Sequence, residues 1–275
     1  MTLFAEPKID CHNHILDPLR FPYAPDTHYR PTGHEIATAA QFTQVLETYG
    51  VQHALLVGPN SGYGLDNRCM LDAIAHGDGR FKGIAVVRND CSEAELIALK
   101  HAGIVGVAFN IALLGEAFYA DTAPLLARLK ALDLFVQVQT EHDQLVSLLP
   151  MLVESGVRIL VDHCGRPTIS AGLQQAGFQA LLSLAKHGRT VVKLSGLIKF
   201  SEQAYPHDDA QPYVRALIDT FTPAACVWAS DWPFLRANAR VDYGLMLTQM
   251  QRWFPVADDR RQVFWDTPRR LFGFA

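Results

Sequence analysis

Eight short apolar runs alternate along the chain with longer amphipathic stretches, and this pattern predicts a single (β/α)8 barrel over residues 1–275. Near-continuous apolar runs are typical of parallel strands that are covered on both faces. Eight strand-helix units in 275 residues also match the number and length of a closed barrel. No G-x-G-x-x-G or G-x-x-x-x-G-K-[ST] loop follows a predicted strand, which argues against a doubly wound open sheet.

The strands are predicted from the apolar runs themselves. The first lies at residues 8–11, and the others lie at 54–57, 83–87, 105–109, 134–138, 158–161, 190–194 and 226–229. A polar, proline-rich loop at 17–31 follows the first strand.

The helices are predicted from amphipathic spacing and from polar residues that can cap a helix. Asp66 is the expected N-cap of the second helix. The helices are expected at 39–49, after Asp66, from Ser92, after Asp121, after His142, and at 178–186, 213–221 and 243–253. The tail at 263–274 mixes aromatic residues with arginine and is expected to pack on the outside of the barrel.

Composition excludes several classes of function. The formal net charge of −4 supplies no general positive field for nucleic acid or an anionic membrane, so the expected partner is a small molecule. The five cysteines are odd in number and lack C-x-x-C spacing, which argues against a disulfide framework and a thiolate zinc site. No export signal or run of roughly 18 apolar residues is visible. These features predict a cytoplasmic protein and leave its oligomeric state open.

Two histidines near the N-terminus are the first candidate site residues. If the first strand continues to residue 14, Asp10, His12 and His14 lie on one face. Two imidazoles that converge on one point can hold a metal ion or grip a reacting carbonyl. The alternative is a pair of surface histidines in a turn.

The ends of the sixth and eighth predicted strands supply side chains that match this pair. The sixth strand is followed by DHCGRP at 162–167, and the eighth by SDWP at 230–233. Because barrel active sites lie at the C-terminal ends of the strands, His12, His14, His163 and Asp231 are expected to face one another. These side chains suit a divalent ion such as zinc. Taken singly, His163 could be a satisfied buried histidine and Asp231 a helix cap.

Both segments belong to a series of motifs that runs through nearly the whole chain. The series is DCHNH at 10–14, YRP at 29–31, DNR at 66–68, GIVGV at 103–107, DHCGRP at 162–167, KLSG at 193–196 and WASDWP at 228–233. With these motifs the chain resembles the amidohydrolase superfamily, in the branch that includes 2-pyrone-4,6-dicarboxylate lactonase and sugar-acid lactonases. The D-H-x-G-R-P and S-D-W-P segments are the most specific part of the resemblance.

The resemblance implies hydrolysis of a lactone or similar ester, with Asp231 as the general base that activates water. His12, His14 and His163 would stabilise charge on the carbonyl oxygen, either through a metal or as direct donors. The lysine or glutamate that bridges two metals in binuclear members is missing at 109–110 and 139–140. The expected cofactor is therefore none, or one divalent ion (zinc or manganese) on His12, His14, His163 and Asp231. Similarity to a metal-independent lactonase favours no tightly held metal.

Substrate recognition is expected to differ from that of the pyrone lactonase. By alignment, Ala108, Leu114 and Lys199 replace arginines of its pocket, and Gln139 replaces a tyrosine. Guanidinium groups are natural partners of carboxylates, so a planar diacid is a poor fit. The expected substrate is a lactone of the sugar-acid or muconolactone-like class.

Three amide side chains at strand ends, those of Asn60, Asn110 and Gln139, could bind the hydroxyl groups of a sugar-derived lactone. Alternatively, they only tie loops together. Both interpretations remain open from the sequence.

Three further side chains complete the candidate binding set. Tyr29 matches a family tyrosine that contacts substrate, although it could instead pack in its proline-rich loop. Lys199 could hold a single carboxylate or be solvated. Arg166 is expected first of all to orient its loop by binding backbone carbonyls. Cys164 has no visible base and is expected to be buried filler rather than a nucleophile.

Other activities fit the same residues. A lactone isomerase or a non-oxidative decarboxylase of the superfamily would use the same aspartate and histidines without net hydrolysis. A non-catalytic binding protein is the alternative from another class, and the intact set of four site residues argues against it.

Overall fold

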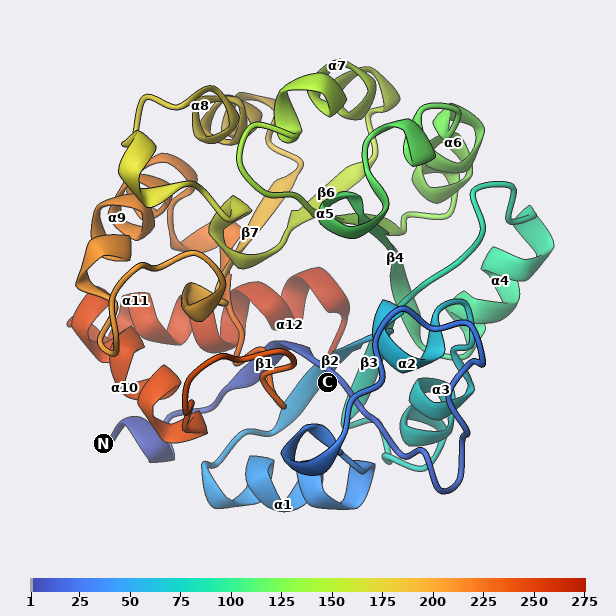
Figure 1. Cartoon of the computed structure of the whole chain (residues 1–275). Helices are drawn as coiled ribbons and strands as arrows, with labels where there is room; N and C mark the ends of the chain where they lie inside the picture. The colour runs from blue at the N-terminus through green and yellow to red at the C-terminus, as the bar shows by residue number, and fades with distance from the viewer. Residues whose placement is uncertain (1) are drawn as a thin grey trace. The chain divides into compact units, whose positions relative to one another are not determined.

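The computed structural model describes residues 2–275, and Figure 1 shows the order of its helices and strands. Eight strands form one sheet in the order in which they occur in the sequence, and the pairings recorded between neighbours are parallel. They are β1 Ile9–Asn13, β2 His53–Val57, β3 Phe81–Ala85, β4 Ile104–Asn110, β5 Phe135–Gln139, β6 Arg158–Val161, β7 Thr190–Leu194 and β8 Cys226–Trp228. Helices separate successive strands, so the predicted (β/α)8 fold class is confirmed.

The eight predicted helices lie close to their expected positions, and the described residues form four further short helices that were not predicted. In chain order, the helices are α1 Ala39–Thr48, α2 Asn60–Tyr63, α3 Arg68–Ala75, α4 Glu93–His101, α5 Ile111–Leu114, α6 Ala123–Ala131, α7 Leu145–Ser155, α8 Ala176–Ser183, α9 Gln211–Phe221, α10 Tyr243–Trp253, α11 Ala257–Arg261 and α12 Thr267–Phe272. The prediction that Asp66 is an N-cap is wrong, because α3 begins at Arg68 with Asn67 in the capping position. The Asp66 carboxylate instead accepts the backbone N–H of Arg68 at 3.0 Å and pairs with its guanidinium at 2.7 Å. These bonds form a turn ahead of the helix.

The chain divides into two compact units, which are described separately. Unit 1 comprises the chain up to Val86, Leu99–Val105 and Trp228–Ala275, and unit 2 comprises Val87–Ala98 and Gly106–Val227. Within residues 2–275, no helix is long and apolar enough to span a membrane.

Aromatic side chains join the strands and helices of unit 1. Phe42 of α1 stacks on Trp232, with ring centroids 4.7 Å apart. In the C-terminal tail, Phe264 meets Trp228 of β8 edge-on at 5.4 Å, and Phe274 lies 4.9 Å from the ring of His53. The tail therefore packs against the strands of this unit.

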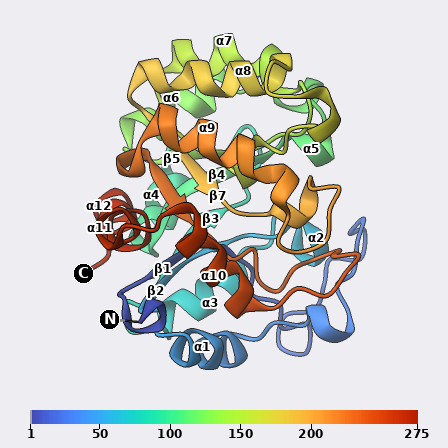
Figure 2. The same cartoon turned by 90° about the vertical axis from the view of Figure 1, so that its left-hand side faces the viewer.

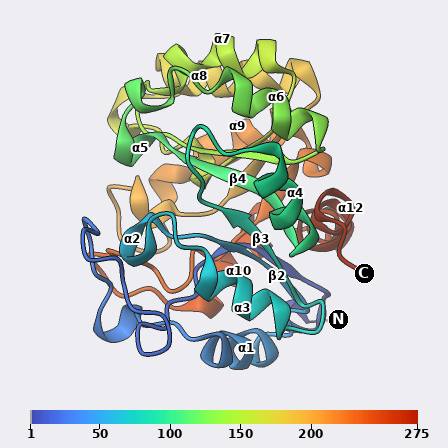
Figure 3. The ribbon, with the colours of Figure 1, turned by 90° about the vertical axis from the view of Figure 1, so that its right-hand side faces the viewer.

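The proline-rich loop at 17–31 is tied to α2 within unit 1, and Figure 3 shows the two side by side. The backbone N–H of Ala24 donates to the carbonyl oxygen of Gly62 at 2.8 Å, and that of Gly62 donates to Tyr29 at 2.9 Å. The ring of Tyr23 lies so close to Gly62 that a Cβ there would be 2.7 Å from it. Glycine is needed at this contact, both for space and for its φ of +80°.

In unit 2, helices α8 and α9 lie side by side (Figure 2), and Phe178 and Tyr213 meet edge-on at 5.0 Å.

Neighbouring strands of unit 2 bury three polar side chains together. Lys193 Nζ lies 3.0 Å from Asp162 Oδ1, and the Gln137 amide donates to Asp162 Oδ2 at 2.8 Å. The buried charges are thus paired and hydrogen-bonded, which limits the cost of removing them from water.

Candidate active site

His12 and His14 lie at the end of β1. The pairing of β1 with β2 matches Asp10 to Ala54 but Asn13 to Leu56, so β1 carries one extra residue before its end. Beyond it, the backbone N–H of His14 donates to the carbonyl oxygen of Trp232 at 2.9 Å. The two imidazole rings meet edge-on with centroids 5.0 Å apart. The end of β1 therefore brings the two rings together beside the loop that follows β8.

Asp231 lies in that loop. Its backbone N–H donates to the carbonyl oxygen of His12 at 2.9 Å, and its Oδ1 lies 3.8 Å from His12 Nε2. Both side chains are buried. Asp231 has a φ of +64°, a left-handed conformation that a residue other than glycine adopts at a cost. Donor atoms of His12, His14 and Asp231 lie within 4.8 Å of one another, so the three can share one ligand.

The partner of His14 determines which of its ring nitrogens carries a proton. Its Nδ1 lies 2.8 Å from the carbonyl oxygen of Val57, at the end of β2. A carbonyl oxygen only accepts, so Nδ1 carries the proton and the neutral ring presents a lone pair at Nε2. Histidines that bind metals commonly donate their second ring nitrogen to such a carbonyl. The neutral form of His14 therefore fits a metal ligand, whereas a donor to an oxyanion would need the doubly protonated ring.

Asp10 shares the predicted strand face with the two histidines but does not join their donor group. Its Oδ1 accepts the backbone N–H of Ser230 at 2.9 Å, and its Oδ2 accepts the hydroxyl groups of Ser230 at 2.6 Å and Tyr243 at 2.9 Å. Burial raises the pKa of the Asp10 carboxyl to about 6, although these hydrogen bonds oppose the rise. Asp10 therefore acts on the loop after β8.

His163 is the candidate residue of unit 2. It follows β6, is buried, and has its Nδ1 3.0 Å from the hydroxyl oxygen of Ser195, which follows β7. Gly196 lies flat against the ring, since a Cβ there would be 2.5 Å from His163 Cγ. Residues 163–166 all have positive φ, so the backbone makes a tight left-handed turn that begins at His163. Such conformations are concentrated at functional sites.

Cys164 is not a plausible nucleophile. Its side chain is fully buried, with Sγ 3.8 Å from the carbonyl oxygen of Lys193 and 3.9 Å from that of Ser195. Burial raises the pKa of its thiol to about 12, so the reactive thiolate is suppressed.

The candidate binding residues of unit 1 are partly engaged within the protein. The Tyr29 hydroxyl donates to Glu35 Oε2 at 2.7 Å, so its oxygen remains available mainly as an acceptor. Glu35 is buried and also accepts the backbone N–H of Arg236 at 2.6 Å. Asn60 begins α2 and is separated from the end of β2 by Gly58 and Pro59.

The binding candidates of unit 2 fall into different groups. The Asn110 side chain caps α5 by accepting the N–H of Leu113 at 3.2 Å, and such a loop-tying role is the alternative left open by the sequence. The Gln139 side chain, at the end of β5, makes no hydrogen bond to another residue within residues 2–275. Lys199 ends a short 3-10 turn after β7 and is half-buried.

The expected binding of backbone carbonyls by Arg166 is wrong. Its guanidinium pairs with the Glu141 carboxylate at 2.9 Å. The left-handed turn directs this side chain to the loop after β5, where a charged partner outcompetes a neutral carbonyl. The pair still ties one strand-end loop to the next.

A model of the amidohydrolase family matches residues 9–274. The chain belongs to this family. The match covers nearly all of the described structure and confirms the resemblance inferred from the motifs.

The amidohydrolase is similar to proteins that act on lactones and pyrones. It is 30% identical over 280 residues to a 4-sulfomuconolactone hydrolase of Rhizobium radiobacter, covering 98% of this chain and 92% of that one. It is 26% identical over 277 residues to a 2-pyrone-4,6-dicarboxylate hydrolase of Comamonas testosteroni, covering 96% and 89%. A solved structure of a probable 2-pyrone-4,6-dicarboxylic acid hydrolase from Acinetobacter baumannii, with citric acid bound, is 28% identical with a TM-score of 0.86, covering 97% and 99%. The amidohydrolase is therefore an enzyme of the hydrolase class.

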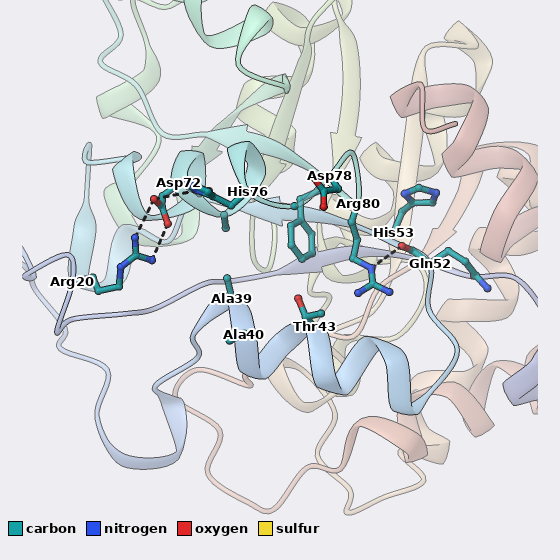
Figure 4. A pocket seen from close by; sticks show the side chains of 13 residues that line it. Arg20, Ala39, Ala40, Thr43, Gln52, His53, Asp72, His76, Asp78 and Arg80 are labelled. Carbon is teal, nitrogen blue, oxygen red and sulfur yellow. Dashed lines mark hydrogen bonds and ion pairs between the residues drawn. The ribbon is translucent and has the colours of Figure 1, made fainter.

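A pocket of about 650 Å³ lies elsewhere in unit 1 of the amidohydrolase, between α1, α3 and the starts of β2 and β3 (Figure 4). Arg20 pairs there with Asp72 at 2.9 Å, and Arg80 donates to the carbonyl oxygen of Gln52 at 3.2 Å. Its lining includes none of the candidate site residues. The pocket is therefore separate from the predicted chemistry.

Sequence reasoning missed the residues that hold the site histidines and Asp231. These are Val57, Ser195 and Gly196, together with Asp10, whose place on the strand face was predicted but whose bonds to Ser230 were not. For Ser195 and Gly196, the KLSG motif at a strand end was an available signal. For Val57 there was none, because its role depends on a backbone carbonyl.

Proposed function

We propose that this amidohydrolase opens a lactone by attack of water, with Asp231 as the general base. The observation that carries the proposal is the buried Asp231 carboxylate, 3.8 Å from His12 Nε2 and held in a left-handed conformation at the end of β8. The relatives named as lactone and pyrone hydrolases support the reaction class.

The reaction needs one proton to leave water and one to reach the leaving group. Asp231 accepts a proton as the water oxygen bonds to the carbonyl carbon, and the negative charge moves to the carbonyl oxygen. The ring carbon–oxygen bond then breaks, and Asp231 returns the proton to the alkoxide. The product is a hydroxy acid. Within unit 1, the N–H group of His12 is the proposed donor to the oxyanion.

One divalent ion, zinc or manganese, fits the donor set of His12, His14 and Asp231 in unit 1. His14 carries the clearest sign of fit, because its bond to Val57 leaves Nε2 as a lone-pair donor. When bound, such an ion would polarise the carbonyl and stabilise the oxyanion.

A lactone with hydroxyl groups or a muconolactone skeleton is the proposed substrate. The amide of Gln139, which bonds no other described residue, supports recognition of a neutral polar group. The side chains of Ala108 and Leu114 have no donor that could bind a second carboxylate. The five cysteines are buried free thiols, which supports the proposed cytoplasmic location.

The test is a panel of aldonolactones, muconolactones and pyrones followed by proton release, before and after dialysis against a chelator. Asp231→Asn should lower kcat by about 10²–10⁴-fold on the best substrate, because the amide cannot accept the proton. Asp219→Asn, on the exposed face of α9, is the matched control and should keep wild-type kcat.

Turnover by Asp231→Asn at the wild-type rate would overturn the assignment of the base. Product analysis separates the rival activities. An isomeric lactone would indicate an isomerase, and released carbon dioxide a decarboxylase.

A further inference from the structure

We propose that Asp10 is a positioning residue that holds the general base Asp231 in place through Ser230. The inference rests on the proposed role of Asp231. Asp10 contributes no donor atom to the group formed by His12, His14 and Asp231 and, on this account, does not touch the substrate. Its effect passes through the short loop after β8.

Ser230 connects Asp10 to both sides of Asp231 in the chain. Asp10 accepts the backbone N–H of Ser230 at 2.9 Å and its hydroxyl at 2.6 Å. The same hydroxyl oxygen accepts the backbone N–H of Trp232 at 3.0 Å. The residues immediately before and after Asp231 are therefore held by one carboxylate and one hydroxyl.

We call the hydrogen bonds that Asp10 and Ser230 make around Asp231 the clamp. Its other side lies in β1. Asp10 Oδ1 accepts the backbone N–H of His12 at 3.3 Å, and the carbonyl oxygen of His12 accepts the N–H of Asp231 at 2.9 Å. Asp10 thus fixes the strand end to which Asp231 is bonded. Tyr243, from α10, donates its hydroxyl to Asp10 Oδ2 at 2.9 Å and completes the set of donors.

This clamp keeps the backbone of Asp231 in its left-handed conformation. A φ of +64° is unfavourable for aspartate, and such a conformation persists only when its surroundings over-determine it. Four hydrogen bonds to Asp10, together with the Ser230–Trp232 bond, provide that constraint.

The environment of Asp10 also indicates that this residue serves the position of Asp231 more than the stability of the fold. Within the described chain its partners are neutral N–H and O–H groups, and no cationic side chain pairs with it. A buried carboxylate without a cation opposes folding. Asp10→Asn should therefore reduce activity more than it reduces stability, a pattern expected of residues that serve the site.

The experiment is a double-mutant cycle in kcat with Asp10→Asn, Ser230→Ala and their combination, using muconolactone as the probe substrate. Each single variant should lose about 10–100-fold in kcat, with KM within about twofold, because the base is misplaced while binding is retained. The double variant should be no slower than the slower single variant, because both changes break the same link. Glu6→Gln, which weakens the buried Glu6–Arg260 pair, is the control and should keep wild-type kcat.

Hydrogen exchange of the peptide at 228–238 supplies a readout that does not depend on turnover. Exchange should rise in Asp10→Asn and stay at the wild-type level in Glu6→Gln. If Asp10→Asn does not fold, Tyr243→Phe and Ser230→Ala are measured in its place.

Wild-type kcat in Asp10→Asn, or additive losses in the cycle, would overturn the proposal. If Asp231→Asn stays active, the assignment of the base fails, and the exchange data then judge Asp10 by themselves. Unchanged exchange at 228–238 would overturn the clamp in that case.

Discussion

The ring nitrogens of His14 and His163 have different partners, and this difference decides what each imidazole can do. The Val57 carbonyl holds a proton on Nδ1 of His14. The Ser195 hydroxyl beside His163 can either donate or accept, so His163 can present an N–H or a lone pair at Nε2. His163 is therefore the more adaptable group, and its orientation depends on Ser195.

Ser195→Ala should lower kcat by about tenfold, because His163 loses the bond that orients its ring. KM should change little, since Ser195 is buried and its hydroxyl bonds the His163 ring. Ser183→Ala, which removes a hydroxyl in α8, is the control. Steady-state kinetics of both variants make the comparison, and equal kcat values would contradict a positioning role for Ser195.

At the scale of elements, one buried carboxylate joins the loop after β1 to the loop after β8. Glu35 accepts the Tyr29 hydroxyl at 2.7 Å, the N–H of Arg236 at 2.6 Å and that of Thr32 at 3.3 Å. Burial raises the pKa of Glu35, but these hydrogen bonds outweigh burial and hold the pKa below its ordinary value. The Arg236 guanidinium also lies 5.3 Å from the Tyr29 ring centroid. The two loops are thus bonded to each other through Glu35.

A lowered pKa means that ionised Glu35 stabilises the folded state at neutral pH. This stabilisation is lost as the pH falls through the lowered pKa and the carboxyl is protonated. Glu35→Gln should therefore lower the free energy of unfolding most at pH 7, and the difference from wild type should shrink below about pH 4. Urea unfolding at pH 7 and pH 3 measures it, with the exposed Glu154→Gln as control. An equal deficit at both pH values would contradict the assignment.

Across the whole chain, segments far apart in sequence build unit 1. β1 and β2 come from the first 60 residues, whereas the segment Trp228–Ala275 comes from the other end of the sequence. Phe264 is fully buried and meets Trp228 of β8 edge-on.

Phe264→Ala should lower the free energy of unfolding by about 3–5 kcal/mol, because it opens a cavity against Trp228. The kcat of the folded variant should stay within about twofold of wild type, since the Phe264 ring packs on Trp228, which is not a candidate site residue. Denaturant unfolding and kinetics at low temperature test the two effects. The exposed Phe118→Ala is the control and should change the free energy of unfolding far less.

The positions of the strands were predictable because their signal is local. Burial on both faces leaves apolar runs that stand out in the sequence, and every predicted strand lies within two residues of an observed one. The start of α3 was less predictable. An aspartate carboxylate can cap a helix or bind a neighbouring side chain, and Asp66 bonds to Arg68 in a turn ahead of the helix. The motifs also identified the family, since they recur through the whole chain.

The sequence by itself determined the fold class, the family and the placement of His12, His14 and Asp231 at strand ends. Only the tertiary structure decided which ring nitrogen of His14 carries a proton, that Arg166 pairs with Glu141, and that Asp10 binds Ser230. The physical reason is the range of the interactions. Apolar periodicity is written in consecutive residues, whereas a hydrogen bond between residues 220 positions apart depends on strand register and on the turn that follows.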